Sequence, residues 1–295
     1  MPSSTVQLSV ALVTCNRPDS LERGLASLRF QSVQPFELIV SDDSERDHVE
    51  QVRKTVAEYG GIYCPGPRRG LYSNRNFIAE QCHGTHIRTM DDDHILPPNH
   101  LALCFEALKS DPSAIWTTGE IGYLSDECSR IAHTADQLGS SGVGEAIRDT
   151  NDNWGIADGS TTYPRDVFDR GFRMVEDFRF GSSYLEFGAY LYRNGWKCRC
   201  VPGALVEHHA TSLRQPDPAS IVFASLCFNV YFRPSLLRSI RHLAPHWREL
   251  PPYPIYSGKR RDDGASAEMR RKSYESALAA MSGLSPQPPL RSGKF

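Results

Sequence analysis

Short apolar runs alternate with leucines at helical spacing along the first part of the chain. Residues 8–14 (LSVALVT) form an apolar run rich in β-branched residues, and residues 38–40 (LIV) form a second one. Such runs are typical of buried parallel strands. Between them, Leu21, Leu25 and Leu28 recur at helical spacing. The alternation of strand and helix predicts an α/β fold with a mainly parallel, Rossmann-like sheet flanked by helices.

Polar residues mark where the first helices begin. Asp19 and Glu22 have the spacing of a capping box, which predicts the start of the first helix. A second helix is expected from Asp47 onward, with Val52 and Val56 on its apolar side. Both helices are expected to pack against the sheet.

The triplet Asp91-Asp92-Asp93 follows residues 85–90, which are expected to form another strand. Carboxylates crowded at a strand end repel one another unless a positive group neutralises them. Carboxylate oxygens are preferred ligands of Mg²⁺ and Mn²⁺, ions that often also bind substrate phosphates. Because side chains alternate along an extended segment, Asp91 and Asp93 should face one way and Asp92 the other. The triplet alone fits a metal site or a solvated acidic turn.

A second acidic pair, Asp42-Asp43, ends the 38–40 strand. Ligands of parallel α/β sheets bind beyond the carboxyl ends of the strands, so the two acidic clusters are expected at one edge. Between them in sequence, Gly70 allows a close backbone approach just before an expected helix. Arg75 would project from the first turns of that helix, toward the acidic cluster or toward a diphosphate.

Composition narrows the function classes. The chain has 295 residues, a formal net charge of −2 and a pI near 6.6, which gives no reason to expect nucleic-acid binding. No apolar run approaches the roughly 20 residues that span a bilayer, and the N-terminus lacks the pattern of a secretory signal. The eight cysteines include no Cys-x-x-Cys pair, which favours free thiols over a zinc cluster. We therefore expect a cytoplasmic protein.

The remainder of the chain has weaker patterns. Residues 124–153 are rich in Gly, Ser and charge without an apolar period, and are expected to form a loop over the site, either a lid or merely mobile surface. Residues 221–240 have the apolar content of a helix. The basic clusters 259–261 and 270–272 fit a solvated tail, or at most peripheral contact with an anionic membrane surface.

Four segments in order, LSVALVTCNRPDSLERGLASLRFQS, ELIVSDDSE, RRGLYSNRNFIAE and MDDDHILPP, resemble family-2 glycosyltransferases of the GT-A fold. Segments 158–166, 187–196 and 200–209 resemble later parts of the same family. The resemblance implies transfer of a sugar from a nucleotide-sugar donor to a hydroxyl acceptor with the help of Mn²⁺ or Mg²⁺. It also implies a GT-A domain over residues 1–213, followed by a helical extension and basic tail over 214–295.

The resemblance further divides that domain into a nucleotide-sugar half (1–95) and an acceptor half (96–213). Asp93 is expected to contact the metal directly, with His208 completing its shell. Asp91 is expected to meet the ribose or the metal. The other residues expected around the nucleotide, a UDP or dTDP, are Thr14, Arg17, Asp42, Asp43, Arg75 and Asp92.

The catalytic base is the point at which the chain departs from the family. The family's Glu-Asp pair is absent from the start of the 187–196 helix, where the chain reads SSYLE and ends in Glu186. Glu186 is therefore the first candidate for the base and Asp158 the second; a carboxylate base on the acceptor side predicts inversion at the anomeric carbon. Without such a base, a retaining transferase of the same fold stays open.

Two other function classes remain open. A sugar nucleotidyltransferase would show a glycine-rich loop after the first strand, where this chain has Cys-Asn-Arg-Pro. A sugar-nucleotide-binding protein without catalysis would fit the missing Glu-Asp pair. The acceptor could be a glycan, a lipid-linked precursor or a small natural product.

Overall fold

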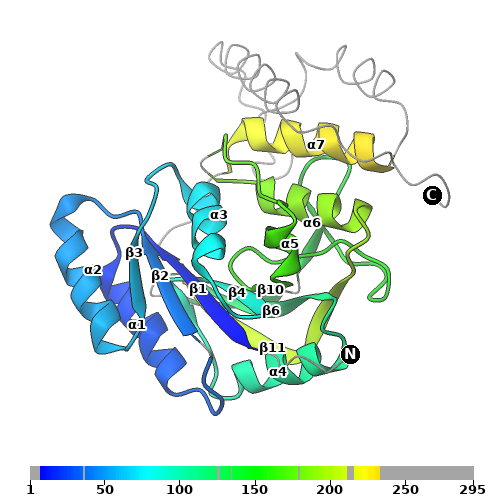
Figure 1. Ribbon diagram of the computed structural model, residues 1–295. Helices are drawn as coiled ribbons and strands as arrows, with labels where there is room; N and C mark the ends of the chain where they lie inside the picture. The colour runs from blue at the N-terminus through cyan, green and yellow to red at the C-terminus, as the bar shows by residue number, and fades with distance from the viewer. Residues whose placement is uncertain are drawn as a thin grey trace, which may run out of the picture.

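The computed structural model of the protein describes residues 7–35, 37–124, 127–133, 135–178, 180–210 and 216–232. Its centre is one large mixed sheet (Figure 1). The strand order is β3 (Ile62–Pro65), β2 (Glu37–Asp42), β1 (Leu8–Thr14), β4 (His86–Asp91), β10 (Thr161–Pro164), β6 (Ile115–Leu124), β11 (Cys198–Ala210) and β5 (His94–Ile95), with β7 (Glu127–His133) paired to β6.

The strands of the N-terminal part run parallel. β1 pairs in parallel with β2 and β4, and β2 pairs in parallel with β3. β10 is antiparallel to both β4 and β6, and it joins the two parts of the sheet. β11 runs parallel to β6 and antiparallel to the short β5. The predicted α/β fold with a mainly parallel sheet flanked by helices is confirmed.

Alternation along β1 explains how the helices are distributed. Leu8, Val10 and Leu12 belong to one core cluster, with side chains of α1 (Pro18–Arg29), α2 (Arg46–Glu58) and α4 (His100–Ser110). Ala11 and Val13 belong to a second cluster on the opposite face, with side chains of α3 (Leu71–Gln81), α5 (Asp166–Asp169) and α6 (Ser183–Arg193). Successive residues of a strand point to opposite faces, so a continuous apolar run fills both layers.

The capping box expected at Asp19 and Glu22 is wrong. Helix α1 begins at Pro18, and its N-cap residue Arg17 makes no side-chain cap hydrogen bond. Proline is favoured at the first helical position because its φ is already suited to the helix and its missing N–H would have no partner there. Asp19 instead lies in the first turn, where its charge favours the helix dipole.

The loop expected over residues 124–153 is also wrong. This region contains β7 and a separate hairpin formed by β8 (Asp136–Leu138) and β9 (Gly144–Ala146). Strand pairing is made by backbone groups, so short polar strands can form without an alternating apolar pattern when a partner strand is at hand. Leu138 of the hairpin is fully buried in a third core cluster.

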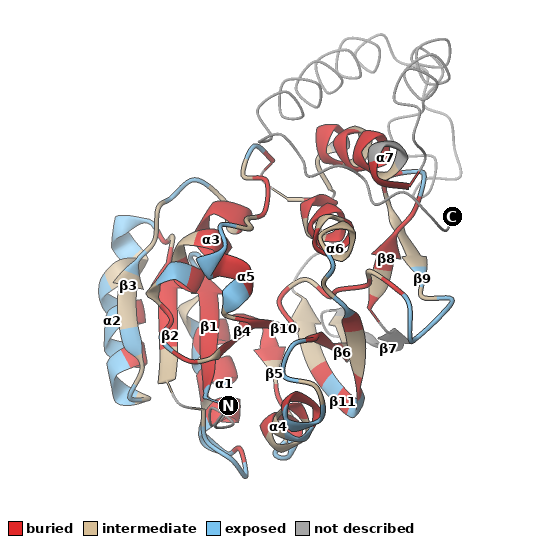
Figure 2. Cartoon of the chain, turned by 45° about the vertical axis from the view of Figure 1, so that its right-hand side comes forward, coloured by how far each residue is buried: buried red, intermediate tan, exposed pale blue. Residues whose placement is uncertain are grey.

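That third cluster holds α7 (Pro218–Phe232) against α6 (Figures 1 and 2). The helix expected over 221–240 is confirmed as far as Phe232; the rest of it and the two basic clusters lie outside the described residues. Within the part of the chain that is described, no helix has the length and apolar character needed to cross a membrane. Strands from both expected halves, 1–95 and 96–213, share one sheet.

Gln31 ties α1 to the segment between β5 and α4. Its buried Nε2 donates to the carbonyl oxygens of Ser27 (3.1 Å), Leu96 (3.2 Å) and Pro97 (2.8 Å), and its Oε1 accepts from the Leu101 amide at 2.9 Å. We expect Gln31→Leu to lower the free energy of unfolding by about 1–3 kcal/mol, because it leaves buried backbone groups without partners. Urea unfolding followed by circular dichroism measures this change.

The control is Gln34→Leu at an exposed neighbouring position, which should change the free energy of unfolding by about 0.5 kcal/mol or less. Equal stabilities of the two variants would contradict a structural role for the Gln31 amide.

Candidate functional site

Three parallel strands end at the same edge of the sheet, and each ends in a polar residue. These residues are Thr14 of β1, Asp42 of β2 and Asp91 of β4. Asp92 and Asp93 form the turn between β4 and β5. The hydroxyl of Thr14 donates to Asp92 Oδ2 at 2.7 Å, which ties the end of β1 to this turn. The acidic clusters therefore lie at the carboxyl edge, as the sequence predicts.

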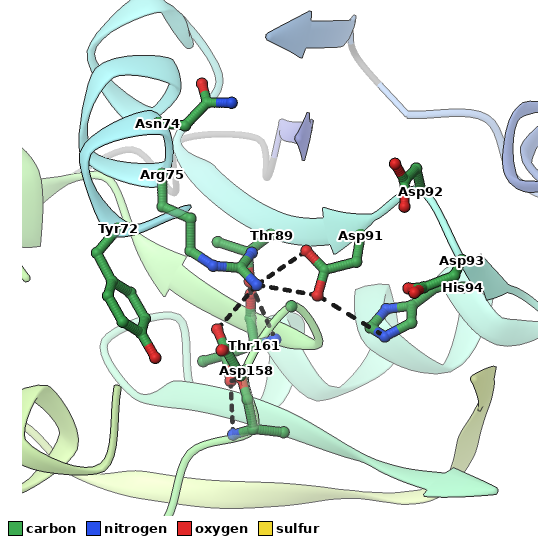
Figure 3. A network of polar contacts seen from close by, with 12 residues as sticks. Tyr72, Asn74, Arg75, Thr89, Asp91, Asp92, Asp93, His94, Asp158 and Thr161 are labelled. Carbon is green, nitrogen blue, oxygen red and sulfur yellow. Dashed lines mark hydrogen bonds and ion pairs between the residues drawn. The ribbon is translucent and has the colours of Figure 1, made fainter. Parts of the chain in front are cut away.

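The carboxylates of the triplet are held by different partners. Figure 3 shows Asp92 pointing away from the side on which Asp91 and His94 meet. Arg17 bridges Asp92 and Asp93, with Nη2 at 2.6 Å from Asp92 Oδ1 and Nη1 at 2.5 Å from Asp93 Oδ2. Arg17 lies three residues after Thr14, at the N-cap of α1, so the connection from β1 to α1 supplies both a hydroxyl and a guanidinium to the triplet.

Arg75 of α3 is buried beside Asp91 (Figure 3). Its Nη2 lies 2.8 Å and 3.0 Å from the two oxygens of Asp91, and 2.8 Å from Asp158 Oδ1. Arg75 Nε and Nη1 are also buried and have no hydrogen-bond partner among the described residues. Of the two roles that the sequence left open for Arg75, the structure shows pairing with the acidic cluster.

Asp158 is the second carboxylate that Arg75 contacts, beside Asp91. Burial raises its pKa to about 6, with Asp91 and Glu120 adding to the rise and Arg75 opposing it. Its side chain keeps 16% of its surface exposed. A carboxyl group with a pKa near neutrality is suited to proton transfer.

A group of possible metal ligands lies next to the triplet. One ligand atom each of Asp93, His94 and His208 lies within 4.8 Å of the others. β5 and β11 bring the two histidines together, because His94 and His208 are directly opposite in the antiparallel register. The buried Nδ1 of His94 has no hydrogen-bond partner among the described residues. A carboxylate with two imidazoles can bind a transition-metal ion such as Mn²⁺, whereas Mg²⁺ prefers oxygen ligands, so these residues fit Mn²⁺ better than Mg²⁺.

Glu120 of β6 supports His208. Its carboxylate lies against His208 Nδ1, while His208 Nε2 lies 3.6 Å from Asp93 Oδ1. Burial opposes protonation of His208, but Asp93 and Glu120 outweigh it and raise the pKa of the imidazole to about 10. A carboxylate behind a histidine is the usual arrangement for orienting a metal-binding imidazole.

Negative charge exceeds positive charge at this edge. The carboxylates are Asp91, Asp92, Asp93, Glu120 and Asp158, and the guanidiniums in contact with them are Arg17 and Arg75. Burial raises the pKa of Asp92 to about 7, despite the opposing charge of Arg17. Such a surplus of carboxylates favours binding of a divalent cation.

Asp42 and Asp43, at the end of β2, differ in how accessible they are. Asp42 is buried, and its two oxygens accept from the Ser44 amide at 2.8 Å and the Tyr63 hydroxyl at 3.1 Å. Asp43 is half-buried and accepts from the Arg68 amide at 2.8 Å. Asp43 is therefore the one of the two that is better able to meet a ligand.

Glu186 lies away from this network. It is buried in α6, and its carboxylate accepts a hydrogen bond from the hydroxyl of Tyr231 on α7. Burial raises its pKa to about 7, with the Tyr231 hydrogen bond opposing the rise. The structure thus gathers Asp158 with Arg75 and Asp91 but not Glu186.

Sequence reasoning missed His94 and Glu120. His94 directly follows the acidic triplet, so its proximity was a usable signal. Glu120 has no local signal, because only the pairing of β6 with β11 brings it beside His208. His208 and its neighbour His209 both lie within β11, which continues to Ala210.

The model of the family described as "Glycosyl transferase family 2" matches residues 9–172. The chain belongs to this family. Its matched part runs from β1 through α5 and so includes the acidic triplet, Arg75, Glu120 and Asp158. The prediction of a family-2 glycosyltransferase is confirmed.

One curated protein is similar to this chain in sequence. A glucosyl-dolichyl phosphate glucuronosyltransferase of Haloferax volcanii is 20% identical over 176 residues, which are 55% of this chain and 54% of the relative. This chain thus matches about half the length of that curated relative.

Two solved structures are similar over most of this chain. S. aureus TarS 1-349, in complex with UDP, matches with a TM-score of 0.63 at 14% identity. The match covers 93% of this chain and 80% of the TarS chain. GalNAc-T7, with UDP, GalNAc and Mn²⁺, matches with a TM-score of 0.65 at 16% identity. The match covers 97% of this chain and 59% of the GalNAc-T7 chain. At these identities the likeness shows the GT-A fold.

Burial of Glu186 makes stability depend on pH. Because the folded-state pKa is about 7, above the ordinary 4.5, the folded state holds this proton more tightly than the unfolded chain. The protonated Glu186 therefore contributes to the free energy of unfolding. This contribution is complete below pH about 4.5 and is lost as pH rises through about 7, and its total is on the order of 3 kcal/mol. We expect Glu186→Gln to flatten the fall of Tm over this range, measured by thermal unfolding at several pH values.

The matched control is Glu106→Gln on α4, whose side chain is 71% exposed. It should reproduce the wild-type pH profile. A wild-type profile in Glu186→Gln as well would argue against a protonated Glu186 in the folded protein.

Proposed function

We propose that this protein transfers a sugar from a UDP- or dTDP-linked donor to a hydroxyl acceptor, with Mn²⁺ or Mg²⁺ bound at the carboxyl edge of the sheet. The observation that carries the proposal is the convergence of Asp93, His94 and His208 within 4.8 Å of one another. The Arg75–Asp91 ion pair lies beside this group. The UDP and Mn²⁺ in the descriptions of the similar structures support the same reading.

The metal ligands would be Asp93, His94 and His208. A bound divalent ion would neutralise the charge that develops on the leaving diphosphate. Glu120 holds His208 Nδ1, which directs Nε2 toward Asp93. Arg17 and Thr14 fix the turn from which Asp93 projects.

The nucleotide would lie along the ends of β1, β2 and β4. Asp43 offers carboxylate oxygens to a base N–H or a ribose hydroxyl, and an imide N–H of uracil or thymine suits such an acceptor. Arg75, buried in contact with Asp91 and Asp158, would offset part of the negative charge beneath the nucleotide. Thr14, Arg17, Asp42, Asp91 and Asp92 shape the same edge.

Asp158 is the stronger candidate for the base. An acceptor hydroxyl must lose its proton as its oxygen attacks the anomeric carbon, and a carboxylate within reach takes it. Asp158 belongs to the Arg75–Asp91 network and is 16% exposed, whereas Glu186 is 2% exposed and bonded to Tyr231. These observations favour Asp158, the second candidate from the sequence, and a direct displacement with inversion.

We expect UDP binding to depend on the divalent ion. Isothermal calorimetry in Mn²⁺ should show clear UDP binding that falls about 100-fold or more with excess chelator, and likewise in Asp93→Ala, because ion and carboxylate jointly hold the diphosphate. GDP should bind more weakly than UDP or dTDP.

The control is Asp166→Ala on α5, an exposed aspartate outside the site, which should bind UDP like the wild type. Undiminished affinity in both the chelated protein and Asp93→Ala would rule out the metal assignment. In the same preparation, incubation with a panel of nucleotide sugars should release a nucleoside diphosphate. Pyrophosphate would point to a nucleotidyltransferase, and no product to a binding protein.

We expect Asp158→Asn to lower turnover by about 10² to 10⁴ while UDP affinity changes little. Asparagine keeps an oxygen that can accept from Arg75 but cannot take a proton. In the wild type, turnover should fall as pH drops below about 6, since the base must be ionised and burial raises the pKa of Asp158 to about 6. Steady-state rates across pH with the donor identified by the panel provide this measurement.

Glu186→Gln serves as the comparison, because it is nearly isosteric and still offers an oxygen to Tyr231. Near-wild-type turnover is expected. Loss of turnover in Glu186→Gln with normal turnover in Asp158→Asn would return the role of base to Glu186.

A further inference from the structure

A second cavity lies outside the candidate active site. It has a volume of about 340 Å³ and is lined by residues of the β8–β9 hairpin, the segment 148–154 and α7. Figure 2 shows this hairpin beside α6 and below α7. We call it the hairpin cavity. Its volume is in the range of small-ligand sites, which start near 300 Å³.

A side-chain amide with no hydrogen-bond partner among the described residues lines the hairpin cavity. Gln137 of β8 is 7% exposed, and no described residue hydrogen-bonds its side chain. Although the residue as a whole is buried, its amide oxygen and nitrogen are not among the fully buried atoms without a partner, so both remain open to a ligand in the cavity. An amide both donates and accepts, which matches the paired donor and acceptor character of sugar hydroxyls.

Aromatic side chains form other parts of the lining. Trp154 and Phe228 both line the cavity, and the Trp154 indole is fixed by a 2.9 Å hydrogen bond from Nε1 to the Leu138 carbonyl oxygen. The electron-rich faces of aromatic rings attract the partly positive C–H groups of a pyranose. An aromatic wall next to a free amide is a combination suited to a sugar ring.

The charged groups of the lining disfavour anionic ligands. Glu145, Asp149 and Asp152 contribute three carboxylates against the single guanidinium of Arg148. Asp152 is anchored by the Tyr192 hydroxyl at 2.8 Å, and Arg148 lies 3.7 Å from Glu145. The remaining negative charge disfavours uronates and phosphorylated sugars, because like charges in contact cost binding free energy. It is compatible with neutral sugars and favours amino sugars.

From these observations we propose that the hairpin cavity binds a neutral or amino sugar unit of the acceptor, remote from the unit that is glycosylated. The acceptor role rests on the proposed function. Trp154 at the cavity and Asp158 at the candidate base are four residues apart, so their Cα atoms lie within roughly 14 Å of each other. That distance is within the length of a short oligosaccharide, which could occupy both positions.

The test uses three trisaccharides with the full-length protein: chitotriose, the glucosamine trimer and trigalacturonate. Calorimetry should show binding of the first two, with trigalacturonate about tenfold or more weaker. Gln137→Leu should lower affinity for chitotriose about tenfold, since it removes the amide hydrogen bonds. Asp149→Lys should reduce the discrimination against trigalacturonate.

Gln51→Leu on the exposed face of α2 is the matched control and should bind all three like the wild type. Absence of binding by both chitotriose and the glucosamine trimer, full affinity in Gln137→Leu, or a preference for trigalacturonate would each overturn the proposal. UDP binding, measured in parallel, separates the two proposals. UDP binding without saccharide binding defeats the cavity assignment alone, and saccharide binding without UDP binding defeats the proposed function alone.

Discussion

Repulsion among buried carboxylates at the carboxyl edge of the sheet is the constraint on which the site depends. Asp91, Asp92 and Asp93 follow one another in sequence, and each needs a positive partner. Arg75 neutralises Asp91, and Arg17 bridges the other two. Arg17 lies at the start of α1, which follows β1, and Arg75 lies in α3, which follows β3. The connections that place the strand ends at this edge therefore also place the guanidiniums that neutralise the carboxylates.

The same edge is completed by strands that follow β5 in the chain. β11 brings His208 opposite His94, and β6 brings Glu120 behind His208. Close packing extends to Gly159, whose φ is +75° and where a Cβ would lie 2.4 Å from Asp91 Oδ2. Only glycine fits there without displacing Asp91, so the segment that carries Asp158 approaches the acidic triplet through a residue with no side chain.

Helix α7 covers a different part of the molecule. It buries Glu186 beneath Tyr231 and contributes Phe228 to the hairpin cavity. A carboxyl group enclosed in this way serves the packing of α6 against α7, and burial favours its protonated form. This part of the molecule is thus built from elements that follow the matched family region, together with a hairpin inside it.

The sequence by itself determined the strands at residues 8–14 and 38–40, the helix after Gly70 and the acidic strand ends, because apolar periodicity and local charge act over a few residues. Tertiary structure alone decided that β7, β8 and β9 form, that Glu120 supports His208, and that Asp158 and not Glu186 joins Arg75. Strand pairing and burial depend on partners far away in the sequence, and no local pattern records which partners these are.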